Sequence, residues 1–117
     1  MTTTPDLPTP AFVADSAAAW ETTGPGVRRK VLAHGSDLML TRVAFETAAV
    51  GARHQPPHAQ ISYVESGMFE YTIEAETRTL RAGDSCYVPP LAWHGVVCTE
   101  AGVLVDAFTP RRDDFLV

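Results

Sequence analysis

Three histidines and a carboxamide are spaced along this chain so that they could bind one metal ion. His54, His58 and Gln60 lie close together, and His94 follows after several short apolar stretches. Imidazole nitrogens suit Zn, Fe, Ni, Cu and Mn, whereas an amide oxygen is a weak neutral ligand. We therefore expect one divalent transition-metal ion, with Zn, Ni, Mn and Fe as candidates. Because the set has no carboxylate, it favours an anionic substrate as a further ligand.

The part played by His58 depends on the two prolines that directly precede it. In an extended strand, a rise of about 3.3 Å per residue places His54 and His58 roughly 13 Å apart. One ion with metal–nitrogen bonds of about 2.1 Å cannot bridge that distance. The prolines argue against a plain paired strand, and a turn through them could fold His58 back toward Gln60. Two ligand sets stay open: one that includes His58, and one of His54, Gln60 and His94 completed by water.

The elements that must position these side chains are predicted to be β-strands. Short apolar stretches are separated by turn residues and do not alternate with helices, which is typical of an antiparallel sandwich or barrel. Ser66-Gly67 is expected to be a tight turn between two strands. The expected strands are 28–33, 38–45, 59–65, 68–74, 77–80, 85–88, 94–98 and 103–108.

The length of 117 residues suits one domain. We expect residues 1–26 to form a tail, ragged at its proline-rich start, and residues 27–117 to form the all-β domain. Residues Asp15 to Thr22 are predicted to form one short helix within the tail, with Asp15 or Ser16 as its cap and Gly24-Pro25-Gly26 as its stop.

The composition excludes several classes of function. The net charge is −5 and no basic run occurs, so a nucleic-acid partner is not expected. No window approaches the roughly 20 apolar residues of a membrane helix, and the N-terminus lacks the pattern of a secretory signal. Two cysteines are too few for a disulfide scaffold and are interpreted as free, buried thiols of a cytoplasmic protein.

Two spaced motifs resemble the paired signatures of the cupin superfamily, whose fold is a small double-sheet jelly roll, or double-stranded β-helix. In the first motif, His54 matches the first ligand position, Gln60 the third and Gly67 the closing glycine. In the second motif, Gly83 and His94 match at the family's distances, with the motif proline between them. The resemblance implies a jelly-roll barrel with a metal site.

The chain departs from the family pattern at several positions. Pro56 stands at the second ligand position and has no donor atom for a metal. Leu91 replaces a usual glycine, and Cys98 replaces a common asparagine. The implied site is therefore one standard ligand short unless His58 takes over.

A narrower resemblance is to the pectin-degradation cupins called KdgF. It implies that the chain converts cyclic 4,5-unsaturated monouronates, left by pectate or alginate lyases, to linear 4-deoxy-5-keto uronates. This is ring opening followed by ketonisation, in which a metal need not change oxidation state. The segments that carry the resemblance are 27–32, 37–40, 62–70, 94–98 and 106–115.

Three residues near the C-terminus are candidates for the remaining roles in such a reaction. Asp106 lies inside an apolar strand, where a charge is costly unless it is paired or functional, and is the candidate proton shuttle. Arg112 is the candidate clamp for the substrate carboxylate, or the partner that orients Asp106. Phe108 shares the face of Asp106 and is a candidate pocket wall, whereas Tyr71 is interpreted as a packing residue.

Two other functions compete with this enzymatic interpretation. One is a sugar-acid-binding cupin without turnover, and the other is a metal-dependent dioxygenase on the same fold. For all three functions the expected partner is a small molecule. For the uronate-converting enzyme and the binding protein it is an anionic sugar. A homodimer is expected as well, because small jelly rolls often pair sheets to cover their edges.

Overall fold

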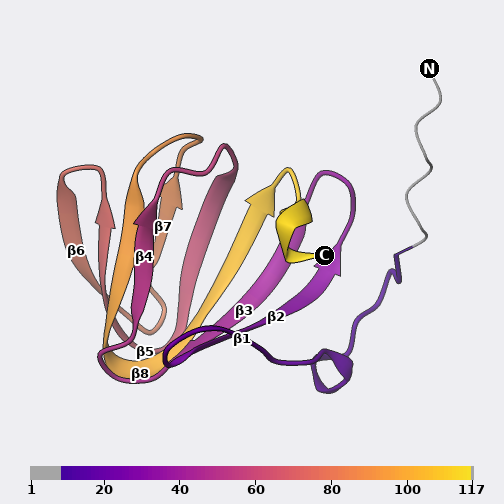
Figure 1. Cartoon of the computed structure of the whole chain (residues 1–117), viewed down its shortest axis with the longest axis horizontal. Helices are drawn as coiled ribbons and strands as arrows, with labels where there is room; N and C mark the ends of the chain where they lie inside the picture. The colour runs from indigo at the N-terminus through magenta and orange to yellow at the C-terminus, as the bar shows by residue number, and fades with distance from the viewer. Residues whose placement is uncertain (1–8, 117) are drawn as a thin grey trace.

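The computed structural model describes residues 9–116 as a rolled antiparallel sheet (Figure 1). The strand order is β1-β2-β3-β8-β5-β6, with β4 also paired to β8 and β7 to β5. This confirms the expected all-β jelly-roll fold. The strands are β1 Glu21–Gly24, β2 Val27–His34, β3 Met39–Phe45, β4 Val50–His54, β5 Ala59–Ile73, β6 Glu76–Arg81, β7 Ser85–Val88 and β8 His94–Thr109.

Two long strands, β5 and β8, run through both layers of the roll. Their first and second halves pair with different neighbours, so each strand bends from one layer into the other. The expected tight turn at Ser66-Gly67 is therefore wrong, because this dipeptide is an irregularity inside continuous β5. Gly67 has a φ of 82°, a left-handed conformation that suits glycine.

The irregularity also changes which residues of β5 point inward. Gln60, Ser62 and Val64 are buried before it, and Phe69 and Tyr71 after it, so the buried positions change from even to odd numbers. One inserted residue in a strand has this effect, because the side-chain period of a strand is two. Both halves of β5 thus direct side chains into the same interior.

The apolar core fills the part of the barrel where β5 and β8 pass from one layer to the other. Phe69 and Phe45 pack edge to face with ring centroids 5.2 Å apart, and Val64, Cys98 and Leu104 are buried around them. Inward apolar and outward polar residues alternate along the strands, as expected for an antiparallel sheet with one solvated face.

Asp15, among the described residues before β1, lies against the outer face of the sheet, and the expected helix does not form. Between residues 9 and 20 a single 3₁₀ turn, η1 Asp15–Ala17, forms, and it buries none of its residues. An isolated helix of this length has no packing surface to stabilise it. The end of the predicted helix is instead strand β1, which pairs with β2.

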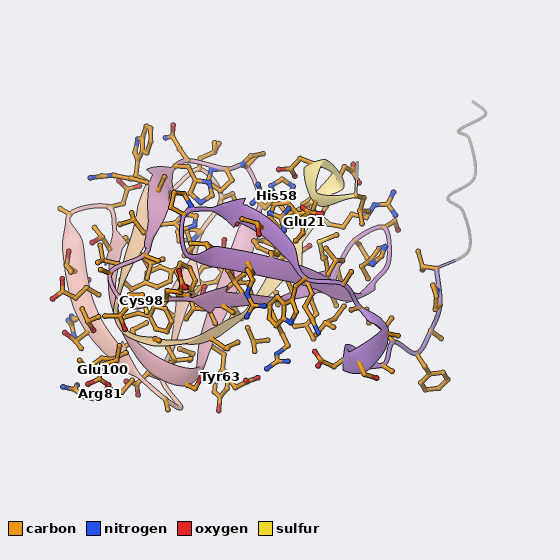
Figure 2. The ribbon with its side chains drawn as sticks, turned by 60° about the horizontal axis from the view of Figure 1, so that its bottom comes forward. Glu21, His58, Tyr63, Arg81, Cys98 and Glu100 are labelled. Carbon is orange, nitrogen blue, oxygen red and sulfur yellow. The ribbon has the colours of Figure 1, made fainter. Side chains whose placement is uncertain are left out.

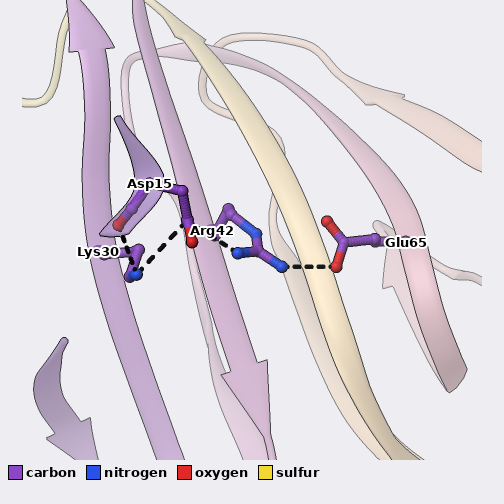
Figure 3. Close-up of polar contacts among 4 residues, drawn as sticks. All are labelled: Asp15, Lys30, Arg42 and Glu65. Carbon is purple, nitrogen blue, oxygen red and sulfur yellow. Dashed lines mark hydrogen bonds and ion pairs between the residues drawn. The ribbon is translucent and has the colours of Figure 1, made fainter. Parts of the chain in front are cut away.

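Ion pairs hold η1 on this outer face (Figure 3). Arg42 Nη1 donates to Asp15 at 2.8 Å and Arg42 Nη2 donates to Glu65 at 2.6 Å. Lys30 donates to the backbone oxygen of Asp15 at 2.9 Å and is almost fully buried. Asp15 of η1 is therefore bound to β2 and β3, and Arg42 links it to Glu65 on β5. No helix in residues 9–116 is long and apolar enough to cross a membrane.

Candidate functional site

Polar side chains from both layers line a cavity of about 440 Å³ inside the barrel. His54 and His94 come from β4 and β8, and Gln60 and Asp106 from β5 and the second half of β8. Arg112 lies between β8 and the 3₁₀ turn η2 Asp113–Phe115. Antiparallel pairing thus brings together residues that are far apart in the sequence.

His54 and His94 form the centre of the cavity's polar lining. They are register partners across β4 and β8, and their Nε2 atoms are 3.1 Å apart. Burial is the main cause that lowers the pKa of both imidazoles, and the neighbouring His94 helps to lower that of His54, which falls to about 4. Both rings are therefore neutral near pH 7, which is the form that binds metals.

The separation of the two nitrogens fits two ligands of one ion. With metal–nitrogen bonds of about 2.1 Å, adjacent ligands of one ion lie about 3.0 to 3.4 Å apart. Strand β4, which the sequence analysis did not predict, is what places His54 beside His94. A divalent ion thus fits the pair, provided that further donors complete its shell.

Gln60 lies on the inner face near this pair and is almost fully buried. Its Nε2 donates hydrogen bonds to Ser62 Oγ at 3.0 Å and to the Tyr71 hydroxyl at 3.3 Å. The amide is therefore held in a defined orientation by two neighbours, and Tyr71 in turn stacks on His94 with ring centroids 6.2 Å apart.

His58 stands apart from the other candidate ligands. Within residues 9–116, no three His, Cys, Asp or Glu side chains gather closely enough to hold a metal ion. The structure therefore brings His54 and His94 together without His58. His58, which is labelled in Figure 2, belongs to the loop between β4 and β5. Its Nδ1 is buried and has no hydrogen-bond partner among the residues that the structure describes.

Asp106 is the buried acid of the cavity, with 7% of its surface exposed. Ser62, its register partner on β5, donates a hydrogen bond of 2.6 Å to its Oδ1. Burial raises the pKa of Asp106 to about 6 and outweighs the opposing effects of Ser62, Gln60 and the Arg112 charge. Such a pKa suits a group that accepts and returns a proton near neutrality.

Arg112 is oriented by Asp114 and makes no hydrogen bond to Asp106. Its Nε and Nη2 donate to the two Asp114 carboxylate oxygens at 3.0 and 2.8 Å. The guanidinium lies 5.4 Å from the centre of the Phe108 ring and 4.2 Å from that of Phe115. The hydrogen bond that Asp106 accepts comes from Ser62, while the Arg112 charge acts on Asp106 without a hydrogen bond. Phe108 is buried and lines the cavity.

Ser62 and Tyr71 are site residues that sequence reasoning missed. The Ser62 hydroxyl lies 2.9 Å from that of Tyr71, which reaches it from the other half of β5. Burial is the main cause that raises the pKa of Tyr71, so its hydroxyl stays protonated. The available signal was the alternation of Gln60, Ser62 and Val64, which places a serine on the inner face.

Known proteins resemble this chain in sequence and in structure. The family model described as "Cupin domain" matches residues 41–108. The pectin degradation protein KdgF of Dickeya dadantii (strain 3937) is 42% identical over 107 residues, which cover 90% of this chain and 97% of that protein. This chain belongs to the KdgF family of cupins.

Two solved structures agree with this family membership. KdgF from Halomonas sp. is 41% identical with a TM-score of 0.87, covering 92% of this chain and 99% of its own. An RmlC-like cupin from Shewanella frigidimarina NCIMB 400 is 36% identical with a TM-score of 0.89, and the match covers 92% of this chain and 96% of that cupin. The cupin barrel described above is therefore shared over nearly its whole length.

Proposed function

We propose that this cupin converts 4,5-unsaturated monouronates, released by pectin or alginate lyases, to linear 4-deoxy-5-keto uronates. The observation that supports it most directly is Asp106, a buried acid with a pKa of about 6 in a cavity with two neutral histidines and an arginine. The 42% identity to the pectin degradation protein KdgF of Dickeya dadantii supports pectin breakdown as the setting.

The residues present fit a divalent ion in this cavity. His54 and His94 would hold it together with Gln60, and water would complete its shell, because His58 does not gather with the two histidines. When bound, such an ion supplies Lewis-acid polarisation of substrate oxygens.

The substrate is a cyclic hemiacetal whose ring oxygen is part of an enol ether beside a carboxylate. Asp106, as the carboxylate, takes the proton of the anomeric hydroxyl, while the bond between carbon 1 and the ring oxygen breaks. Carbon 1 becomes an aldehyde, and the bonding electrons remain on the former ring oxygen as an enolate. Asp106 then gives its proton to carbon 4, which leaves a ketone at carbon 5, so the whole step is an isomerisation.

Neighbouring residues orient the substrate and keep Asp106 competent. Ser62 donates to Asp106 and is itself held by Tyr71 and Gln60, which fixes the direction of the carboxylate. The Arg112 charge, anchored by Asp114, attracts the anionic sugar, and Phe108 forms an apolar wall.

We also propose that the protein is a homodimer. The outer face of the β3, β8, β5 and β7 layer carries a row in which Leu40, Ala107, Ile61 and Tyr87 are successive register partners, and all but the half-buried Ala107 are exposed. Apolar residues that lie side by side on a surface are a common feature of interfaces between proteins.

A progress curve tests the proposed reaction. Lyase-made unsaturated monouronate is followed with and without protein by the loss of absorbance of the conjugated double bond. Faster loss with protein supports the proposal, and an unchanged rate with metal-loaded, folded protein contradicts it. Oxygen uptake during the same reaction would instead support a dioxygenase, and ligand binding without any rate increase would support a binding protein.

A further inference from the structure

Two arginines flank one aromatic ring in the lining of the cavity. The guanidinium carbon of Arg29 lies 3.5 Å from the centre of the Phe115 ring, and that of Arg112 lies 4.2 Å from the same centre. The two guanidinium groups are therefore within about 8 Å of each other, the range in which partly buried charges act on the same anion.

The two arginines differ in how their hydrogen-bond donors are used. Asp114 engages both Nε and Nη2 of Arg112. Arg29 makes one hydrogen bond within the described chain, from Nη2 to Glu21 at 3.0 Å. Because a guanidinium carries five N–H donors, Arg29 keeps most of its fork available to a ligand.

The position of Arg29 is unusual for a charged residue that only has a structural role. It follows Val27 on the inward face of β2, and its side chain is 17% exposed, whereas that of Glu21 is 64% exposed. A surface partner of this kind stabilises an ion pair little. Because burying a charge is costly unless it is paired, a second anion inside the cavity would stabilise the largely buried Arg29 guanidinium.

We propose that Arg29 binds the carboxylate of the sugar acid in this cavity, together with Arg112, and so selects anionic over neutral sugars. The inference rests on the proposed function for the class of substrate, but it concerns binding and not turnover. Glu21 competes with the ligand for the Arg29 fork, and the Phe115 ring lies against both guanidinium groups.

The test is a binding measurement by calorimetry with two unreactive sugars, D-galacturonate and D-galactose. The wild-type protein should bind galacturonate more tightly than galactose. Arg29→Gln should weaken galacturonate binding about tenfold or more, the range of a charge-assisted hydrogen bond, and leave galactose binding within about twofold. Arg29→Lys should give an intermediate loss, because it keeps the charge without the fork.

Arg28→Gln is the matched control. It removes the same charge from the neighbouring position, but Arg28 is exposed and lies 4.7 Å from the Trp20 ring. It should leave the binding of both sugars unchanged. Glu21→Gln provides an independent arm if Arg29→Gln fails to fold, because it frees the Arg29 fork and should tighten galacturonate binding severalfold.

The possible results separate the role of Arg29 from the proposed reaction. The role of Arg29 is overturned if the wild type does not prefer galacturonate, if folded Arg29→Gln retains that preference, or if Glu21→Gln weakens galacturonate binding. In a separate turnover assay, Arg29→Gln should raise KM with little change in kcat. A wild type that selects galacturonate through Arg29 but never consumes the unsaturated monouronate would overturn the proposed reaction alone.

Discussion

Asp106 shows how a single residue can be costly for folding and useful for chemistry. Its carboxylate is taken out of water, and one strong hydrogen bond from Ser62 does not fully compensate for the lost solvation. A raised pKa is the measurable sign of this imbalance. The same imbalance gives a base and acid that exchange a proton near neutral pH.

Asp106→Asn should therefore abolish most activity and stabilise the protein at high pH. The folded-state pKa is about 6 and the unfolded value 3.8, so the carboxyl contributes stability below pH 4 that is lost as the pH rises through 6. The variant should gain up to about 3 kcal/mol relative to wild type between pH 4 and 8. Urea unfolding at several pH values measures this gain.

The control for that variant is Asp37→Asn, at an exposed position of the loop between β2 and β3. It should change neither the activity nor the pH dependence of unfolding. Wild-type activity in Asp106→Asn would refute the proton shuttle. If the stability of Asp106→Asn depended on pH as that of the wild type does, the Asp106 carboxyl would not be the cause of that dependence.

Ser62→Ala should move the acidic limb of the activity profile to higher pH. The Ser62 hydroxyl stabilises the Asp106 carboxylate, so its loss raises the pKa of Asp106 further, and a higher pH is needed to form the base. A pH–rate profile of kcat/KM measures the shift. Ser85→Ala, at the exposed start of β7, is the control that should leave the profile in place.

His94→Ala should remove the bound metal. The variant leaves His54 without its nearest nitrogen neighbour, and a single imidazole is a weak site. Elemental analysis of purified protein gives the metal content, which should fall to a small fraction of one ion per chain. His34→Ala, at the end of β2, should keep its metal. Metal retained by His94→Ala would show that the ion is bound elsewhere.

At the scale of the elements, the bend of β5 decides where the site residues meet. The irregularity at Gly67 allows Ser62 and Tyr71, from opposite halves of one strand, to face the same interior. A Cβ on Gly67 would lie 2.6 Å from the Glu100 oxygen and the Gly102 Cα. Both the backbone conformation and this close approach to β8 require glycine here.

Gly67→Ala should destabilise the fold by about 1–3 kcal/mol or more, because it combines a strained backbone with overpacking. Thermal unfolding measures the change. Gly24→Ala is the control, since an added Cβ meets nothing within 4 Å there and should have an effect within about 0.5 kcal/mol. Equal stability of the two variants would contradict the role given to the bend.

The sequence predicted most strands but divided β5 and β8 at residues that resemble turns. Ser66-Gly67 has turn composition, and local composition does not distinguish a turn from a bend within a continuous strand. The match of His54 and His94 to the two cupin motifs implied that they converge, although strand β4, which places His54 beside His94, was not predicted. Ser62 and Arg29 were not predicted as site residues, since their importance comes from contacts that only the rolled sheet creates.

At the scale of the whole molecule, the exposed apolar row on the outer layer predicts a dimer interface. Ile61→Glu, at the middle of the row, should convert the dimer to a monomer, because a buried unpaired charge opposes association. Light scattering coupled to size-exclusion chromatography measures the mass. Val50→Glu, on exposed strand β4, is the control that should leave the mass unchanged. A monomeric wild type would contradict the proposal.

The cavity of about 440 Å³ is near the lower end of the range for small-molecule sites. A space of this size accommodates one hexose ring, whereas a polysaccharide requires a groove that runs across the surface and is open at both ends. The protein would then act after the polymer has been cleaved, on single rings that other enzymes have already liberated. Its throughput would follow the supply of those rings, irrespective of the length or branching of the polymer from which they came.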